Sequence, residues 1–403
     1  MRDVIVVGAG GGGPVVAKEL AERGLDVLLL EAGPRHAHPR EEWTHYENDA
    51  NHPLTGFFRF GPADRAKSAW FRETPQSSFV MQLSGVGGTT QHYFANSPRA
   101  YPGAFSGYSG PDAGAYDTRH RFPFPYAELV PYYEWVEATL PVQTAAMGTK
   151  EEVYFQGCET LGIPVQTALT TTGDSYRPQQ NAILQPGGHA GRTADPRLLI
   201  FPRSTGCTFC GHCSQGCMQP VRAPRNQFAK RSTDNSYVPM ALTADVWSPG
   251  GRAAELITDA FVTRIHTEAG AATGVTWRNR EFLARKATAL LRGAGARTVL
   301  RVDMFPVPLH VQSSLRTGLD PRTSVLDADC RSRAVDRLYV ADNSALANSL
   351  GGPNPTLTTQ ALAARTAERV FTRVFGGDPW VRTGAPVVST DLRVSRRLAE
   401  LGL

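Results

Sequence analysis

Apolar residues at the start of the chain change from one periodicity to another. Asp3–Val7 (DVIVV) is a short β-branched run that is typical of a strand, and GAGGGG follows it at once. From Val15 to Arg23 the apolar residues recur at helical spacing. A second apolar run, Asp26–Leu30 (DVLLL), predicts another strand, which ends at Glu31. This order of strand, turn, helix and strand predicts an α/β fold with a parallel sheet.

The glycine turn has the spacing of a dinucleotide-binding loop. Gly8, Gly10 and Gly13 satisfy G-x-G-x-x-G: the first glycine permits the tight turn, the second lets the backbone approach a pyrophosphate, and the third lets helix and strand pack closely. The helix N-terminus then directs its partial positive charge at the phosphates. Glu31 is placed to accept hydrogen bonds from the adenosine ribose. The motif alone does not separate FAD from NAD, but the continuation EAGP resembles flavoprotein oxidoreductases and favours FAD.

Apolar periodicity predicts further elements along the chain. A helix is predicted over Pro125–Leu140, and alternating strands with a glycine turn lie between Ala254 and Trp277. A last helix runs from Thr356 to about Phe375. Its small apolar residues are expected in the core rather than in a site: Leu357, Ala361, Ala364 and Ala367.

Composition excludes some classes of protein. With 403 residues, of which 41% are hydrophobic and 20% charged, the chain is ordinary for a globular protein. The formal charge of +5 is small and the arginines form no basic runs, so no nucleic-acid partner is expected. No leader-like N-terminus and no apolar run of membrane-spanning length are present, so we expect no membrane span and a cytoplasmic location. The oligomeric state is not determined by these patterns.

A cysteine cluster has the spacing of a bacterial ferredoxin. Four of the six cysteines form C-x2-C-x2-C-x3-C, and thiolates at such intervals can wrap an iron–sulfur cube. A single cube could also need Cys158 or Cys330 as a remote ligand. Reduced structural thiols are the main alternative, followed by zinc or a disulfide. The candidate metal ligands are Cys207, Cys210, Cys213 and Cys217.

Three further segments resemble the glucose-methanol-choline (GMC) family of oxidoreductases. Gly85–Tyr93 (GVGGTTQHY) resembles the loop that runs along the flavin, and Cys207–Ala241 resembles a cysteine-bearing stretch of some members. His310–Val370 resembles the closing signature, with LYVADNS over Leu338–Ser344 and NPTLT over Asn354–Thr358. The resemblance covers most of the chain, and within it Phe282–Leu291 looks like the helix just upstream of the catalytic histidine. It implies a Rossmann-like FAD-binding domain interleaved with a substrate domain built on a mostly antiparallel sheet.

The resemblance also suggests domain boundaries. Residues 1–100, 200–279 and 320–403 are assigned to the discontinuous FAD-binding domain, and residues 101–199 and 280–319 to the substrate domain. Only about thirty residues separate Trp277 from His310, where relatives have a much longer segment. We therefore expect either that a segment near Asn279 and Arg280 is missing from this sequence or that the protein has lost it, and we favour the first.

By resemblance, His310 and Asn354 carry the chemistry. His310 would take the hydroxyl proton of an alcohol while the flavin N5 takes the hydride, and histidine suits this task near neutral pH. Asn354 would orient the substrate oxygen. The chain departs from the family next to His310, because Ser313, Ser314 and Arg316–Gly318 replace the usual Gly-Thr pair and Arg-Met-Gly turn.

The remaining FAD contacts are likewise implied by the resemblance. Asp342 corresponds to an aspartate near the ribityl and phosphate groups, and Val262 to a contact with the adenosine end. The run Gly351–Pro353 lets the loop that carries Asn354 pass close to the ring. The last helix starts after Pro355 with the amides from Thr356 onward open to the flavin's polar edge.

The flavin loop contains a candidate attachment site. Gly87 and Gly88 keep the offset to His92 at which pyranose-oxidase-like members join a histidine covalently to the flavin. An ordinary flavin-facing histidine is the alternative.

These observations predict FAD-dependent oxidation of an alcohol to a carbonyl. A sugar or glycoside hydroxyl is the first choice of substrate, and a sterol or long-chain alcohol the second. Electrons would pass to oxygen or to another acceptor. A nicotinamide enzyme has no reason to keep the C-terminal signature, whereas a non-catalytic or electron-transfer flavoprotein stays open. Aromatic residues of the 101–138 region could stack on a sugar but at this spacing are more often core: Tyr101, Tyr108, Tyr116, His120, Tyr132, Tyr133 and Trp135.

Overall fold

The computed structural model describes the chain in separate ranges of residues. The described residues are 2–35, 71–73, 79–81, 85–91, 93–106, 120–144, 149–163, 180–184, 206–207, 213, 217, 228–279, 312–348, 350 and 354–402. Helices are α1 (Gly13–Ala21), α4 (Gly103–Ser106), α5 (Tyr126–Thr139), α6 (Thr149–Thr160), α7 (Tyr237–Leu242), α8 (Ala244–Trp247), α10 (Thr356–Val374) and α11 (Leu392–Glu400). Strands are β1 (Val4–Val7), β2 (Val27–Leu30), β3 (Phe71–Glu73), β4 (Phe79–Met81), β5 (Gln143–Thr144), β6 (Gln180–Asn181), β7 (Glu255–Ile257), β8 (Ala260–Glu268) and β9 (Ala271–Asn279).

A parallel sheet confirms the predicted α/β class. Its order is β1-β2-β7, with Val4 opposite Val27 and Leu28 opposite Glu255. Parallel neighbours need a crossover, and α1 supplies it between β1 and β2. Strand β7 comes from far along the sequence, so the sheet joins the start of the chain to its middle.

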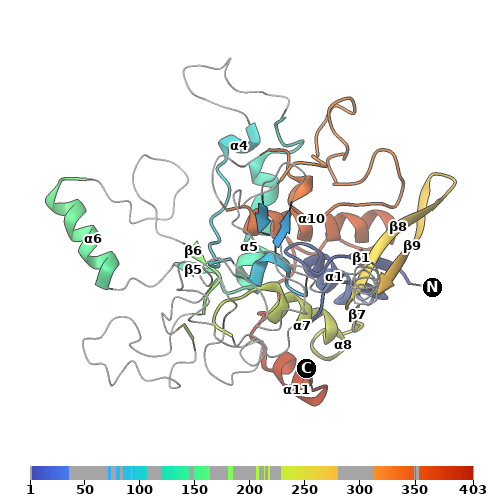
Figure 1. Cartoon of the computed structure of the whole chain (residues 1–403), viewed down its shortest axis with the longest axis horizontal. Helices are drawn as coiled ribbons and strands as arrows, with labels where there is room; N and C mark the ends of the chain where they lie inside the picture. The colour runs from blue at the N-terminus through green and yellow to red at the C-terminus, as the bar shows by residue number, and fades with distance from the viewer. Residues whose placement is uncertain are drawn as a thin grey trace, which may run out of the picture.

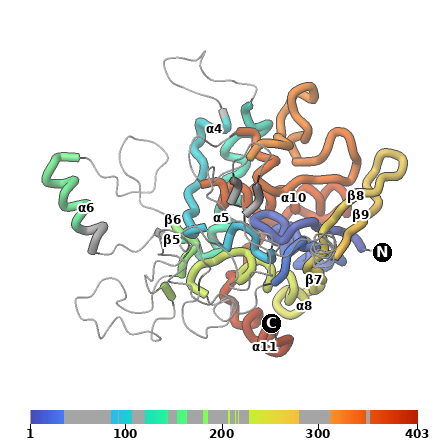
Figure 2. Tube along the Cα trace, viewed as in Figure 1, coloured from blue at the N-terminus to red at the C-terminus, as the bar shows by residue number. Residues whose placement is uncertain are grey.

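Helix α10 packs against both α1 and α5 (Figure 1). In the tube view, the blue start of the chain and the orange-red α10 run close together (Figure 2). The helix extends over Thr356–Val374, close to the predicted range. Small side chains let the neighbouring helices approach, and those expected in the core are all fully or almost fully buried: Leu357, Ala361, Ala364 and Ala367.

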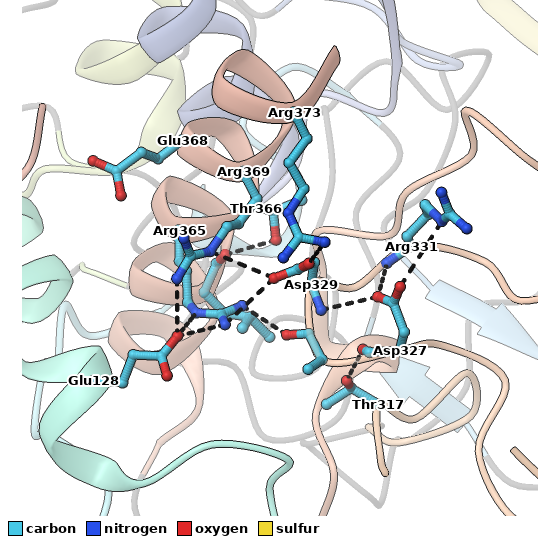
Figure 3. Close-up of polar contacts among 12 residues, drawn as sticks. Glu128, Thr317, Asp327, Asp329, Arg331, Arg365, Thr366, Glu368, Arg369 and Arg373 are labelled. Carbon is cyan, nitrogen blue, oxygen red and sulfur yellow. Dashed lines mark hydrogen bonds and ion pairs between the residues drawn. The ribbon is translucent and has the colours of Figure 1, made fainter. Parts of the chain in front are cut away.

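An ionic network fixes α10 to its surroundings. Arg365, Arg369 and Arg373 follow one face of the helix and point at Glu128 of α5 and at Asp329 (Figure 3). The Arg365 Nε donates to Glu128 Oε1 at 2.9 Å, although Arg365 is almost fully buried. Paired arginines of this kind are strongly held because a buried guanidinium without its carboxylate is costly.

A second buried ion group fixes α1. Lys18 is fully buried, and its ammonium lies 2.9 Å from Glu19 Oε1 and 2.7 Å from Glu22 Oε2. The same nitrogen is 5.5 Å and 5.4 Å from the ring centroids of Trp135 and Trp247. Cation–π contacts of this kind strengthen when water is excluded. The helix that follows the glycine turn is therefore held on its far side by α5 and α8.

The other strands pair in antiparallel fashion: β3 with β4, β5 with β6, and β8 with β9. The β8–β9 hairpin projects at the edge of the molecule, and α6 lies apart from the other helices (Figure 1). Tyr132, Tyr133 and Trp135 are buried, as expected for core aromatics. The predicted Phe282–Leu291 helix lies outside the described residues, and the proposed domain boundaries stay predictions. Within the described ranges, none of the helices combines the length and the apolar character that crossing a bilayer requires.

Candidate cofactor site

The glycine turn joins β1 to α1 and leaves one side of its backbone open. Gly8 has a φ of 98°, a conformation that favours glycine, and its N–H donates to Leu30 O at 2.7 Å. A Cβ on Gly13 would lie 2.0 Å from Gly8 O, so only glycine allows this packing of helix on strand. A Cβ on Gly8 or Gly10 would meet nothing within 4 Å. The turn is thus tightly packed at Gly13, where the helix meets the strand, and has open space beside Gly8 and Gly10.

Glu31 directly follows β2, and its carboxylate is hydrogen-bonded to the backbone of the glycine turn. Its side chain is buried, with Oε2 accepting from Ala9 N at 2.7 Å and Oε1 accepting from Gly33 N at 2.9 Å. The Glu31 carbonyl also accepts from Ala260 N at 2.8 Å, which brings the start of β8 to this edge. The half-buried Val262 lies two residues further along β8.

The loop with the sequence GVGGTTQHY packs on the glycine turn. We call residues 85–93 the flavin loop, of which 85–91 and 93 are described. Gly87, with a φ of 100°, donates from its N–H to Ala9 O at 2.7 Å. A Cβ on Gly88 would lie 2.7 Å from Gly10 Cα, so the two glycine-rich segments touch backbone to backbone.

Thr233 completes this contact from a third part of the chain. Its hydroxyl donates to Gly10 O at 2.9 Å and lies 3.1 Å from the Thr90 hydroxyl. Thr233 is buried in the short 3-10 helix η6 (Thr233–Asn235). The flavin loop and the glycine turn are therefore fixed to each other by a shared hydroxyl network.

The C-terminal region reaches the turn as well. A Cβ on Gly12 would lie 1.7 Å from Ala341 O, which places the predicted LYVADNS segment directly against the start of α1. The next residue, Asp342, accepts at Oδ1 from Ser344 N at 2.8 Å and caps the short 3-10 helix η7 (Asn343–Ala345).

Asn354 lies just before α10. It is half-buried, Pro355 is buried, and Thr356 is the first residue of the helix. No side chain caps the N-terminus of α10, so its first amides are not used by a capping residue. The first backbone N–H groups of α10 can therefore donate hydrogen bonds to a bound group. His310 and His92 lie outside the described residues, so their roles stay predictions.

Residues 207–217, which we call the cysteine segment and of which Cys207, Cys213 and Cys217 are described, contact the buried Lys230. Lys230 Nζ donates to Cys213 O at 2.6 Å, and Lys230 N donates to Cys217 Sγ at 3.4 Å. Cys207 N donates to Leu184 O at 2.9 Å. Within the described part of the chain, no group of three or more histidine, cysteine or acidic residues could hold a metal ion. Cys210 lies outside that part, so the iron–sulfur cluster stays a prediction.

Lys230 and Arg231 were not among the predicted site residues, yet both are almost fully buried. Burial lowers the pKa of Arg231 to about 10, against the favourable charges of Tyr93 and Asp234. Its guanidinium donates to Asn235 O at 2.7 Å and to Ser389 O at 3.2 Å. The only sequence signal was a Lys-Arg pair directly before the polar run STDNS, which is indistinguishable from a solvated loop.

The residues around the glycine turn fit a dinucleotide with a pyrophosphate. The open face of Gly8 and Gly10 gives room for it, and the N-terminus of α1 has no side-chain cap. Gln91 Oε1 is buried on the flavin loop and has no hydrogen-bond partner among the described residues. A buried acceptor without a partner is costly and indicates a donor from a bound group.

Two family models match the chain. Residues 3–41 match an FAD binding domain, and residues 254–363 match the model described as GMC oxidoreductase. The first segment holds β1, the glycine turn, α1, β2 and Glu31. The second holds β7, β8, β9 and the first part of α10.

Curated relatives match parts of the chain. The fructose dehydrogenase large subunit of Gluconobacter japonicus is 32% identical over 156 residues, 35% of this chain and 27% of the relative. Paromamine 6'-oxidase of Streptomyces fradiae is 34% identical over 35% of this chain and 23% of its own length. The 2-methyl-1,2-propanediol dehydrogenase of Mycolicibacterium austroafricanum is 27% identical over 68% of this chain and 45% of its own length.

The chain spans less than half the length of these relatives. The matched segments nevertheless meet in space, because Gly12 of the first touches Ala341 of the second. The FAD-binding segment and the C-terminal region are therefore each similar to known families, the second to the GMC oxidoreductases.

Proposed function

We propose that this chain uses FAD to oxidise an alcohol hydroxyl to a carbonyl. The observation that carries the proposal is the contact of Gly12 with Ala341, which joins the FAD-binding segment to the GMC segment at one site. The relatives support the reaction class, since they are named as dehydrogenases and oxidases of fructose, paromamine and a diol.

FAD, when bound, supplies the hydride acceptor. Gly8 and Gly10 let the backbone approach its pyrophosphate, and the N-terminus of α1 favours the negative charge. Asn354 and the amides at the start of α10 orient the substrate oxygen and the flavin edge. His310 receives the hydroxyl proton on its imidazole.

The substrate proposed first is a sugar or glycoside hydroxyl. Its support is the family resemblance together with the relatives named for fructose and paromamine. A sterol or long-chain alcohol is second. Because relatives are named both as oxidases and as dehydrogenases, oxygen and another electron acceptor are both proposed as the oxidant.

Anaerobic reduction tests the proposal. The purified protein should be yellow, and a sugar of the right class should bleach the flavin absorbance under nitrogen. The variant Asn354→Ala should still bind FAD but bleach about a hundredfold more slowly, an effect typical of removing a positioning group. Failure of every compound in a broad panel of sugars, sterols and alcohols would instead favour an electron-transfer flavoprotein.

Two finer proposals use the same sample. A covalent link at His92 predicts that flavin fluorescence stays with the denatured polypeptide on a gel, and His92→Ala should release it. An iron–sulfur cluster on the cysteine segment predicts iron and acid-labile sulfide in stoichiometric amounts. A sample with flavin but without iron would exclude the cluster and leave structural thiols, zinc or a disulfide.

A further inference from the structure

Lys230 joins two segments that are far apart in the sequence. Its side chain is 1% exposed, and its ammonium donates to three backbone carbonyls: Gln91 O at 2.6 Å, Tyr93 O at 3.2 Å and Cys213 O at 2.6 Å. Two of these acceptors belong to the flavin loop, on either side of position 92. The third belongs to the cysteine segment. One cation therefore links the backbones of both segments.

The main chain around Lys230 is itself firmly held. Arg231 N donates to Ala182 O at 2.8 Å, and the Tyr93 hydroxyl donates to Arg231 O at 2.6 Å. Asn235 Nδ2 donates to Lys230 O at 2.8 Å. These hydrogen bonds fix the backbone at Lys230, and the ammonium therefore has a defined position.

The link continues to the glycine turn. A few residues after Lys230, the Thr233 hydroxyl donates to Gly10 O, and Gly87 of the flavin loop donates to Ala9 O. The flavin loop is therefore held on one side by Lys230 and on the other by the glycine turn. Moving the carbonyls of Gln91 or Tyr93 would disturb the loop that lies against Gly10.

The choice of lysine at this position has a physical reason. An ammonium has three donor hydrogens and can satisfy three carbonyls that converge from different directions, which neither a neutral amide nor a planar guanidinium does as well. Charge-assisted hydrogen bonds are about twice as strong as neutral ones. The nitrogen also lies 5.5 Å from the centroid of the Tyr93 ring, which adds a cation–π contact.

We propose that Lys230 is a positioning residue that holds the flavin loop in its cofactor-binding geometry and couples it to the cysteine segment. This inference rests on the proposed binding of FAD at the glycine turn. It predicts that removal of the ammonium lowers the protection from hydrogen exchange in both linked segments together, in the flavin loop at Gln91 and in the cysteine segment at Cys213.

The variants Lys230→Met and Lys230→Arg test this. We expect Lys230→Met to remain folded, to raise the dissociation constant of FAD about tenfold or more, and to shift the visible spectrum of the bound flavin. Amide hydrogen exchange should accelerate together at residues 85–91 and in the segment that contains Cys213 and Cys217. Lys230→Arg, which keeps a charge, should recover part of each effect.

Leu398→Ala is the matched control, because Leu398 is buried in α11, far along the chain from both segments. It should lower the melting temperature without changing FAD affinity or exchange in either segment. The proposal is overturned if this control, at equal loss of melting temperature, reproduces the effects of Lys230→Met. It is also overturned if a folded Lys230→Met keeps both FAD affinity and exchange within about twofold of the parent.

A failure of FAD binding itself gives a different result. If the parent protein binds no flavin, the proposed function fails, yet hydrogen exchange at the flavin loop and the cysteine segment still reports on the link. Joint acceleration in the apoprotein of Lys230→Met would then preserve the coupling, and unchanged exchange would reject it.

Discussion

Gly12 and Ala341 lie in backbone contact, although they come from opposite ends of the chain: a Cβ on Gly12 would lie 1.7 Å from the Ala341 carbonyl oxygen. Two residues earlier in the same turn, a Cβ on Gly10 would meet nothing within 4 Å. One glycine is therefore required by the protein's own packing, whereas the other leaves room for a ligand. Substitutions at the two positions should therefore have different effects: one on the stability of the fold, the other on binding of the cofactor.

Gly12→Ala should destabilise the protein and Gly10→Ala should not. The added methyl group at position 12 collides with main chain that cannot rotate away, so we expect a loss of about 3 kcal/mol of unfolding free energy. At position 10 we expect an unchanged apoprotein, or a gain of up to about 1 kcal/mol from reduced backbone entropy. Urea denaturation of both apoproteins measures the difference. FAD titration should show weakened binding in Gly10→Ala, and undiminished affinity there would remove Gly10 from the cofactor site.

Glu31→Gln should weaken both the turn and FAD binding. The carboxylate accepts hydrogen bonds from Ala9 N and Gly33 N with different oxygens, and an amide would direct its own donor at one of them. We expect a loss of about 1–3 kcal/mol in the apoprotein and a lower FAD affinity. Glu255→Gln on the neighbouring strand is the control, because Glu255 is exposed and pairs with Arg2 at the surface. Equal stability of Glu31→Gln and the parent would contradict the assigned hydrogen bonds.

The ionic network of α10 predicts a pH dependence. Burial raises the pKa of Glu128, but hydrogen bonds and charges from Arg365 and Arg369 outweigh it, so the pKa is lowered from 4.5. A lowered carboxyl pKa contributes stability above the unfolded-state value that is lost as pH falls through the folded-state value. Unfolding free energy should therefore decrease as the pH is lowered below about 4.5, and Glu128→Gln should flatten that decrease.

The control for this prediction is Glu134→Gln, an exposed position on the same helix. Chemical denaturation of the three proteins from pH 3 to pH 6 gives the comparison. A pH profile of Glu128→Gln that parallels the parent would assign the acid lability to other carboxylates.

Local chemistry made the nucleotide-binding start predictable. Strands β1 and β2 begin one residue inside the predicted runs and end where predicted, because β-branched residues and the glycine turn determine them within a short window. Helix α1 begins at Gly13 rather than at Val15, since Pro14 is favourable in a first helical turn. The predicted bounds of the last helix, Thr356 to about Phe375, are likewise close to those of α10.

Tertiary contacts made other features unpredictable. Strand β7 was read as one of several alternating strands, and only its register with β2 places it in the parallel sheet. Lys230, Arg231 and Arg365 are charged residues that patterns assign to the surface, but they are buried because carbonyls and carboxylates from other segments converge on them. No local window contains the partners of Lys230 and Arg365. Arg231 has local acceptors and also the distant Ser389. His310 and His92 lie outside the described residues, so the proton-transfer part of the site rests on resemblance alone.

The pairing of β2 with β7 has a consequence for synthesis in the cell. Leu28 emerges from the ribosome long before its partner Glu255. Until then the nascent chain carries a nucleotide-binding edge whose outer strand has an unsatisfied row of amides and carbonyls, a surface prone to intermolecular association. The edge of β2 should therefore become covered only once residue 257 has emerged from the ribosome, and ribosome-bound chains arrested before and after that point should differ in protease resistance at β2.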